Sequence, residues 1–326
     1  MDSLRNSFRR LNPLTRAESD RSATEGTAES RTILDSDFVQ SMPFWLPPTL
    51  MVLLFVYGAI GWNVVISFTG WSGLGQPEYA NFTLEMYRQL PADQNFRKSF
   101  INTVVLLVSF TGVSLVVGLG LAVLVDRKIR FENAFRTIYL LPMALSFVVT
   151  AIFWSWMYRS GEDAGLVNTT LQAVGLDALA QDWLGDPRFK LAAVIFALVW
   201  QFSGYCMIVY LAGLRSIPDD HYEAARIDGA STLTLYRRVI IPQLRSSTIG
   251  AVVVLMVFAL KAFDFIYVMF GTNPGRSVDI LAVTMYREAF AKTQWAYGAA
   301  IAVVLFLLAL SIIGPYAYTQ YKRGAL

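Results

Sequence analysis

Six long apolar stretches constrain the fold of this chain more than any other feature. Each is near or above the ~20 residues that a helix needs to cross the hydrocarbon core of a bilayer. A lone strand in lipid would leave its backbone amides unpaired, so helices are predicted. With 55% hydrophobic and 16% charged residues, the chain is also more apolar than ordinary soluble proteins. We therefore expect an all-α membrane protein with six transmembrane helices, at residues 44–68, 99–125, 137–158, 191–214, 247–270 and 295–318.

The first 43 residues differ in composition from the rest. They mix arginines with acids, serines and threonines and contain few large apolar side chains. Such a segment buries too little surface to offset its ordering entropy. The first apolar stretch also begins too far into the chain, and is too long, for a cleavable signal peptide. We predict a disordered cytoplasmic tail over residues 1–43 and one transmembrane domain over residues 44–326, with no second soluble domain.

Loop charges predict the orientation. Taken together, the tail, the second and fourth loops and the C-terminus hold more lysine and arginine residues than the other three loops do together. Because such residues favour the cytoplasmic side, both termini are predicted to be cytoplasmic. In the second span, Ser114, Gly118 and Ala122 recur at every fourth residue, which predicts a face for close helix contact.

The cytoplasmic segment 218–242 is the one long polar interval between two spans that reads as ordered structure. Asp219 and Asp220 are predicted to cap a helix and to suit the positive end of its dipole. Gly229 tolerates the left-handed conformation that ends helices. Ser231 is predicted to cap a second short helix, which Pro242 ends or kinks because it lacks an amide hydrogen.

Small and acidic side chains on this first helix suit contact with another protein. Ala224 and Ala225 let a partner's backbone approach closely, and Glu223 and Asp228 offer carboxylates to cations. A docking element is one interpretation. An ordinary solvated connector between membrane helices is the alternative that composition favours.

Lys261 and Asp264 are charged residues inside the fifth apolar stretch. A charge at mid-bilayer costs about 2.5–3.5 kcal/mol on insertion scales, so both side chains are expected to face protein or water. Three residues apart on a helix, they share a face and can pair with each other. Holding helices in register and lining a translocation path are both open roles.

Gln201 and Tyr205 are the candidates for such a path in the fourth span. They lie four residues apart and so share a helical face, whereas Tyr210 points elsewhere. Rings and amides together suit a sugar, which has apolar faces and hydroxyl groups. Packing is the competing role for each of the many aromatic residues in the third and fourth spans.

The sequence lacks the motifs that several classes of enzyme and metal site require. The sequence contains no Gly-x-x-x-x-Gly-Lys-Ser/Thr loop for ATP and no Gly-x-Ser-x-Gly elbow. With one histidine, His221, and one cysteine, Cys206, neither a disulfide nor a histidine-built zinc site is expected. We predict no catalytic residue, no metal site and no cofactor bound by this chain, and no nucleic-acid partner.

The segment 218–242 resembles the EAA loop of permease subunits of ATP-binding-cassette (ABC) importers. Glu223, Ala224, Ala225, Gly229 and Pro242 stand at the matching positions, with Val239 and Ile241 where the family usually has Ile and Leu. Further motifs resemble the carbohydrate-uptake branch of binding-protein-dependent importers. These are Phe135-Arg136-Thr137, Leu140-Leu141-Pro142, Gly165-Leu166-Val167-Asn168, Leu214-Arg215-Ser216-Ile217-Pro218 and Phe263-Asp264.

The resemblance implies a sugar importer of a prokaryotic inner membrane, in which this chain is a multi-pass permease. A periplasmic or extracellular binding protein delivers sugar to a path formed with a second homologous permease, and two ATPase subunits use ATP. The EAA loop, between helices 4 and 5, then acts as a cytoplasmic coupling helix. Glu223, Ala224, Ala225, Asp228, Gly229 and Pro242 would couple to the ATPase, and Lys261, Asp264, Gln201 and Tyr205 would lie near the path.

Other transport functions stay open. A permease of the same superfamily for a polyol or a glycerol phosphate ester fits the same motifs. An ion-coupled secondary transporter would use Lys261 and Asp264 as its coupling pair but would leave the segment 218–242 without a role. A membrane structural protein is disfavoured by the polar residues inside the spans.

Overall fold

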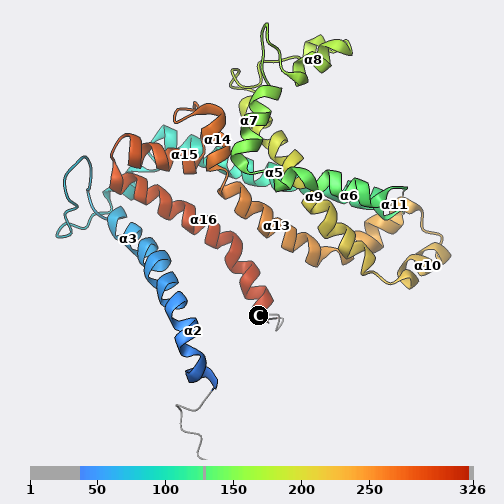
Figure 1. Ribbon diagram of the computed structural model, residues 1–326, viewed down its shortest axis with the longest axis horizontal. Coiled ribbons are helices and arrows are strands. Elements are labelled where there is room, and N and C mark those ends of the chain that lie inside the picture. Colours follow the sequence, from blue (N-terminus) through green and yellow to red (C-terminus); the bar gives the residue numbers. More distant parts are fainter. Residues whose placement is uncertain (1–36, 128–129, 323–326) are drawn as a thin grey trace, which may run out of the picture. The chain divides into compact units, whose positions relative to one another are not determined.

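The structure is a computed structural model that describes residues 37–127 and 130–322. Every regular element within these ranges is helical (Figure 1). Four helices are long and apolar enough to cross a membrane, and two bent helix pairs raise the number to six if each pair forms one span. The described residues therefore confirm an all-helical protein with four to six candidate spans. The chain divides into two compact units, residues 1–61 and 62–326.

The first candidate span, Ser41–Ser67, combines α2 (Asp37–Val52), the π-helical turn η3 (Leu53–Tyr57) and α3 (Gly58–Ser67). It agrees closely with the predicted span 44–68. Residues 1–36 of the predicted tail lie outside the described residues, and α2 already includes residues 37–43.

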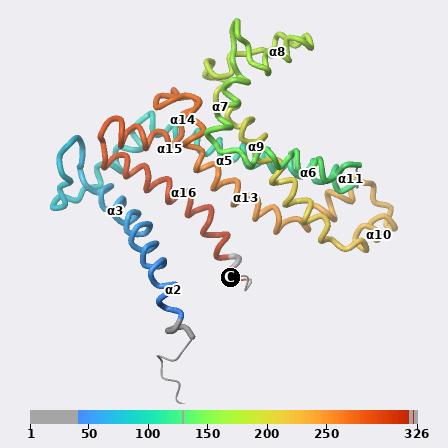
Figure 2. Tube along the Cα trace, in the orientation of Figure 1, coloured from blue at the N-terminus to red at the C-terminus, as the bar shows by residue number. Residues whose placement is uncertain are grey.

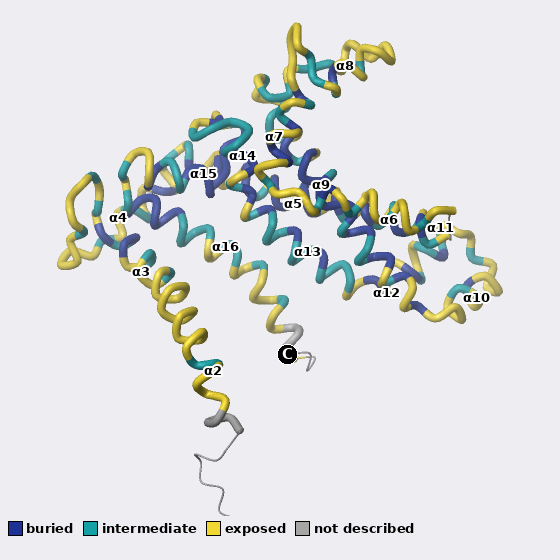
Figure 3. The backbone as a smooth tube through the Cα atoms, viewed as in Figure 1, coloured by how far each residue is buried: buried dark blue, intermediate teal, exposed yellow. Residues whose placement is uncertain are grey.

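The core of the second unit is built on α5 (Gln94–Asp126) and α9 (Lys190–Arg215), which pack along each other (Figure 2). The predicted small-residue face of α5 is buried here, at Ser114, Gly118 and Ala122. A Cβ atom added to Gly118 would collide with Cys206 of α9. Buried residues recur along both helices, more densely along α9 than along α5 (Figure 3). Small residues thus permit the close approach that the sequence predicted.

The third predicted span is bent instead of continuous. The helices α6 (Glu132–Leu140) and η4 (Leu141–Ala144) turn by 101° into α7 (Phe147–Met157). Leu145 is extended, and the Ser146 hydroxyl accepts a hydrogen bond from the Val149 amide at 3.3 Å. A serine that caps a new helix explains why the chain turns here.

The fifth predicted span, 247–270, is interrupted as well. The helix α13 (Arg245–Leu260) ends at Lys261, whose amide donates to the carbonyls of Val257 and Phe258, and α14 (Phe263–Phe270) begins two residues later. A lysine at a helix C-terminus interacts favourably with the helix dipole. Lys261 and Asp264 consequently lie on either side of a break and not on one continuous helix.

A helical hairpin follows that the sequence did not predict. It contains α15 (Leu281–Tyr286) and the π-helical turn η7 (Arg287–Ala291), and it leads into α16 (Trp295–Lys322). Polar groups of α5 hold it: the Asn102 amide donates to the Asp279 carbonyl at 2.9 Å, and the Thr103 hydroxyl accepts from the Leu281 amide at 3.0 Å. The remaining short elements are α4 (Glu85–Gln89), α8 (Leu166–Ala173) and η5 (Asp177–Leu179).

Candidate functional site

The segment 218–242 begins with α10 (Asp219–Ile227), close to where the sequence predicted a helix. The predicted side-chain cap is wrong, because Pro218 occupies the capping position and no side chain caps the helix. Asp219 and Asp220 lie in the first turn instead, where their charges still suit the helix dipole. Proline supplies the extended backbone that precedes a helix without any hydrogen bond from its side chain.

Gly229 ends α10 in the left-handed conformation, with φ of 75°. The Ala230 amide donates to the Ala225 carbonyl and the Gly229 amide to the Arg226 carbonyl, each at 3.0 Å. This pair of bonds is the Schellman motif, which requires a residue that tolerates positive φ. The predicted glycine stop is therefore confirmed, and it fixes the direction in which the chain leaves α10.

The second helix of the segment also begins as predicted. Ser231 accepts a hydrogen bond from the Thr234 amide at 3.4 Å at the start of α11 (Thr232–Leu235). The helix continues through η6 (Tyr236–Ile240), a π-helical turn, into α12 (Ile241–Gln243). It ends directly after Pro242, and the chain turns by 67° into α13. The end near Pro242 agrees with the predicted break.

The two alanines of the segment face in opposite directions. Ala225 is buried against Ile217, Leu235 and Ile240, so it attaches α10 to the helices behind it. Ala224 is exposed, as are Glu223, Asp228 and Gly229. Much of α10 is accordingly coloured as exposed in Figure 3.

Sequence reasoning missed two apolar residues on this surface. Ile227 is 86% exposed and Leu233 is 78% exposed, although both lie in an otherwise polar segment. An apolar residue between charged neighbours, as Ile227 is between Arg226 and Asp228, is a signal that would have found the first of them. Together with Ala224 they give the segment an apolar surface beside its carboxylates.

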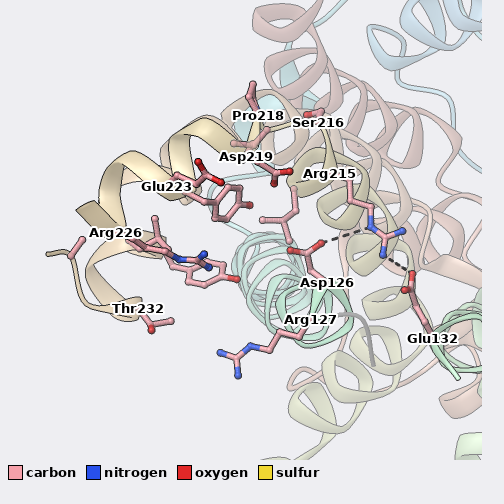
Figure 4. A pocket seen from close by; sticks show the side chains of 16 residues that line it. Asp126, Arg127, Glu132, Arg215, Ser216, Pro218, Asp219, Glu223, Arg226 and Thr232 are labelled. Atoms are coloured by element: carbon pink, nitrogen blue, oxygen red, sulfur yellow. Dashed lines mark hydrogen bonds and ion pairs between the residues drawn. The ribbon is translucent and has the colours of Figure 1, made fainter. Parts of the chain in front are cut away.

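A cavity of about 1380 Å³ separates α10 from the ends of α5 and α9 (Figure 4). Asp126, Glu132 and Arg215 line one part of it, and Asp219, Glu223 and Arg226 line another. We call it the α10 cavity.

Arg215, the last residue of α9, connects three helices at this cavity. Its Nη2 donates to Glu132 Oε1 at 2.7 Å, and its Nε lies 3.8 Å from Asp126 Oδ1 (Figure 4). Glu132 also pairs with Arg136 one turn along α6. The side chains are partly exposed, so the network positions the helix ends more than it stabilises the fold.

A second cavity, of about 280 Å³, lies at the bend before α7, and we call it the polar cavity. Three of the four path residues predicted from the sequence line it: Gln201, Lys261 and Asp264. Rings of Phe147, Phe202 and Phe258 complete much of its wall. Within the described residues, no ion pair or hydrogen bond joins Lys261 to Asp264, although the sequence allowed such a pair.

The side-chain amide of Gln201 is hydrogen-bonded through its nitrogen but not through its oxygen. Its side chain is 1% exposed, and Nε2 donates to the Leu145 carbonyl at 2.9 Å. Its Oε1 atom is buried and has no hydrogen-bond partner in the structure. A buried acceptor without a partner costs free energy, so it is suited to receive a hydrogen bond from a hydroxyl group or water in the cavity.

The remaining aromatic candidates are placed differently. Tyr205 packs at the edge of the core and is not among the residues that line the polar cavity. Tyr210 is buried, its hydroxyl lies 3.1 Å from that of Thr248, and it is not among the residues that line the polar cavity. Trp154 and Tyr158 are also buried in the core, as the packing interpretation expected.

Solved structures share the fold. A bacterial alginate ABC transporter, crystallised with a periplasmic protein that carries an alginate pentasaccharide, contains a chain that superposes with a TM-score of 0.71. The alignment covers 89% of this chain and 96% of that chain at 22% sequence identity. At this identity the likeness establishes the fold.

Sequence comparisons establish the family. Residues 114–324 match the model of the binding-protein-dependent transport system inner membrane component. The xylose/arabinose import permease of Haloferax volcanii is 52% identical over 297 residues, which are 91% of this chain and 92% of that protein. A probable ABC transporter permease of Pyrococcus horikoshii is 53% identical over 279 residues, 86% of this chain and 94% of that protein.

Family membership confirms the division of labour that the sequence predicted. A permease of this kind is the transport component and is not itself an enzyme; it binds no cofactor, and partner subunits hydrolyse ATP. A binding protein and ATPase subunits are its partners, and the chain is a multi-pass protein of the inner membrane. The chain belongs to the binding-protein-dependent transport system inner membrane components and is a permease of an ABC importer.

Proposed function

We propose that this permease imports sugars, and specifically the pentoses xylose and arabinose. The observation that carries the proposal is the 52% identity to a xylose/arabinose import permease along nearly the whole of both chains. The polar cavity supports it, because its volume of about 280 Å³ suits one small sugar. Its walls offer aromatic rings for the apolar faces of a sugar and polar groups for the hydroxyls.

The transporter contains a second homologous permease, two ATPase subunits and a binding protein outside the membrane. Residues 44–326 form the transmembrane domain, with six spans and both termini in the cytoplasm. The third span contains the 101° bend between Ala144 and Phe147, and the fifth begins after the 67° turn at the end of the segment 218–242. The excess of lysine and arginine in the second and fourth loops supports this orientation, which places α10 beside the ATPase.

The segment 218–242 transmits ATPase closure to the spans. Glu223, Ala224, Asp228 and the exposed Ile227 contact the ATPase, and the Schellman motif at Gly229 holds the two helices of the segment at a fixed angle. Coupling requires a stiff element, because a flexible loop would absorb the motion. Pro242 and the 67° turn connect this movement to α13, which ends at Lys261 in the polar cavity.

The polar cavity is part of the translocation path. Gln201 Oε1 accepts a hydrogen bond from a sugar hydroxyl, and Lys261 and Asp264 supply a donor and an acceptor across the cavity. Tyr205 remains a candidate on the adjoining turn of α9, outside the cavity itself.

An uptake assay tests the substrate. The permease is reconstituted in proteoliposomes with its partner subunits and binding protein, and accumulation of labelled xylose, arabinose, glucose, glycerol and glycerol 3-phosphate is compared. Pentose uptake that requires ATP and the binding protein is expected. Uptake of the polyol or the phosphate ester alone would contradict the pentose assignment, and ATP-independent uptake abolished by ionophores would indicate an ion-coupled transporter.

A bulky substitution tests the coupling surface. Ala224 is exposed, so Ala224→Trp is expected to fold and reach the membrane but to lose ATP-driven uptake through poor contact with the ATPase. Ala92→Trp is the matched control, because Ala92 is exposed in a loop outside this segment. Normal uptake by Ala224→Trp would remove α10 from the coupling surface.

A further inference from the structure

Six aromatic side chains form a continuous series at the outer end of the second unit. Successive ring centroids lie 5.1–5.6 Å apart along the series. The members come from α14, η7 and its neighbour α15, the start of α16 and the loop after α3. We call this series the aromatic ladder, and it consists of Phe263, Tyr267, Tyr286, Phe290, Trp295 and Trp71.

The inner end of the ladder is next to the polar cavity in the sequence, although no ring of the ladder is among the residues that line this cavity. Phe263 directly precedes Asp264, which lines that cavity. The Phe263 ring stacks on Tyr267 at 5.3 Å and lies 5.1 Å from the ring of Tyr286. The helices α14 and α15 contact each other (Figure 2), which brings these three rings into one group.

The outer end of the ladder is fixed by backbone hydrogen bonds. The Trp295 indole donates to the Gly73 carbonyl at 2.9 Å, and the Trp71 indole donates to the Gly75 carbonyl. The Ala296 amide donates to the Trp71 carbonyl at 3.0 Å. With both indole N–H groups bound, the two rings stack on each other at 5.5 Å and keep a defined orientation.

All six rings of the ladder keep part of their surface exposed. Phe290 is 58% exposed, and the other five are partly exposed. The group around Trp154 differs in that its central rings, Trp154 and Tyr158, are buried. Each ring of the ladder therefore has surface that packing within the described residues leaves uncovered.

We propose that the aromatic ladder binds sugars and guides them from the outer loops to the polar cavity. The proposal rests on sugar import as the proposed function. A pyranose presents C–H groups on its faces, which pack on flat rings, and a series of similar rings at one spacing offers successive weak sites. The Tyr267 and Tyr286 hydroxyls hydrogen-bond to each other and still have lone pairs that can accept from a sugar hydroxyl. An interface belt that anchors the protein in lipid is the competing role for these residues.

The test uses the complete transporter in proteoliposomes, with xylose and arabinose as probes. Phe290→Leu and Tyr286→Leu keep apolar volume but remove the flat ring. Each is expected to lower the number of sugar molecules imported per ATP hydrolysed by roughly two- to tenfold, the range expected for loss of one aromatic contact. ATP hydrolysis stimulated by the loaded binding protein is expected to stay at the wild-type rate. Phe290→Trp keeps a flat ring at this position, so it is expected to retain the wild-type ratio of sugar imported to ATP hydrolysed.

Phe306→Leu is the matched control, because Phe306 is also exposed and lies on α16 outside the ladder. A wild-type ratio of sugar to ATP in both ladder variants would overturn the proposal and leave sugar import intact. The same conclusion follows if the variants reduce only the amount of assembled transporter, since that is the result expected of a lipid anchor. If the wild-type transporter imports neither pentose, the proposed substrate itself fails.

Discussion

Arg215 donates a hydrogen bond to Glu132 at 2.7 Å and thereby connects the end of α9 to the start of α6. Arg215 is three residues from Pro218, where the coupling segment begins. The same guanidinium lies 3.8 Å from Asp126 at the end of α5. One cation therefore connects three helix ends close to α10, and in the proposed coupling a movement of α10 would act on all three helices.

Replacing Arg215 is expected to reduce the coupling of ATP hydrolysis to sugar uptake more than it reduces the free energy of unfolding. Arg215→Ala should lower the free energy of unfolding by less than about 1 kcal/mol, because the pairs are partly exposed. Sugar uptake per ATP should fall, because α9 can then move without α6. Arg188→Ala, which removes a surface pair with Asp186, is the control and should leave uptake unchanged. A wild-type ratio in Arg215→Ala would show that the network carries no motion.

Replacing Gly229 with proline should abolish uptake. Proline holds φ near −65°, whereas Gly229 has φ of 75°, so the Schellman motif cannot form. The variant is expected to remain in the membrane, since Gly229 lies outside the apolar spans. Gly175 also has φ of 75° but lies in the loop after α8, so Gly175→Pro applies the same backbone strain elsewhere. Equal loss of uptake in both variants would point to general misfolding.

Gln201→Met is expected to raise the apparent KM for pentose uptake by roughly three- to tenfold, the equivalent of one lost hydrogen bond. The change removes the Oε1 acceptor that has no partner within the protein while it keeps a similar side-chain volume. Tyr210→Phe is the control on the same helix, because it removes only the contact with Thr248. An unchanged KM in Gln201→Met would exclude Gln201 from sugar binding.

Asp279 and Arg287 form a buried ion pair at 2.7 Å in the segment between α14 and α16. Arg287→Gln leaves the carboxylate of Asp279 buried without its partner and should reduce the free energy of unfolding by about 3–5 kcal/mol. Asp279→Asn combined with Arg287→Gln should recover most of this loss, because no buried charge then lacks a partner. Thermal unfolding in detergent measures both changes. Equal stability of the single and double variants would contradict this account.

The same pair predicts a pH dependence. Burial raises the pKa of Asp279 above its usual value and outweighs the opposing effect of Arg287. The folded protein therefore holds this proton at pH values where the unfolded chain has released it. Stability should fall as pH rises from the usual carboxyl pKa through the raised value, and Asp279→Asn should remove that part of the slope. Scans of unfolding temperature against pH compare the two proteins.

Local patterns in the sequence determined the number of apolar segments and the limits of the segment 218–242. Whether a segment is long enough to cross lipid depends only on consecutive residues. Gly229 and Ser231 likewise end and begin helices through contacts with residues next to them in the chain. Their roles could therefore be predicted without any knowledge of distant residues. The same holds for the small face of α5, which depends only on the helical repeat.

Tertiary structure decided where the spans break and which polar residues meet. Gln201 reaches the carbonyl of Leu145 because α7 starts at a bend, and Lys261 joins the same cavity because α13 ends there. The hairpin of α15 and η7 likewise depends on hydrogen bonds from Asn102 and Thr103 in a remote helix. Whether a segment forms a helix across lipid depends on the length of its own apolar run. A buried polar group, in contrast, forms its hydrogen bond with whichever partner the fold brings within hydrogen-bonding distance.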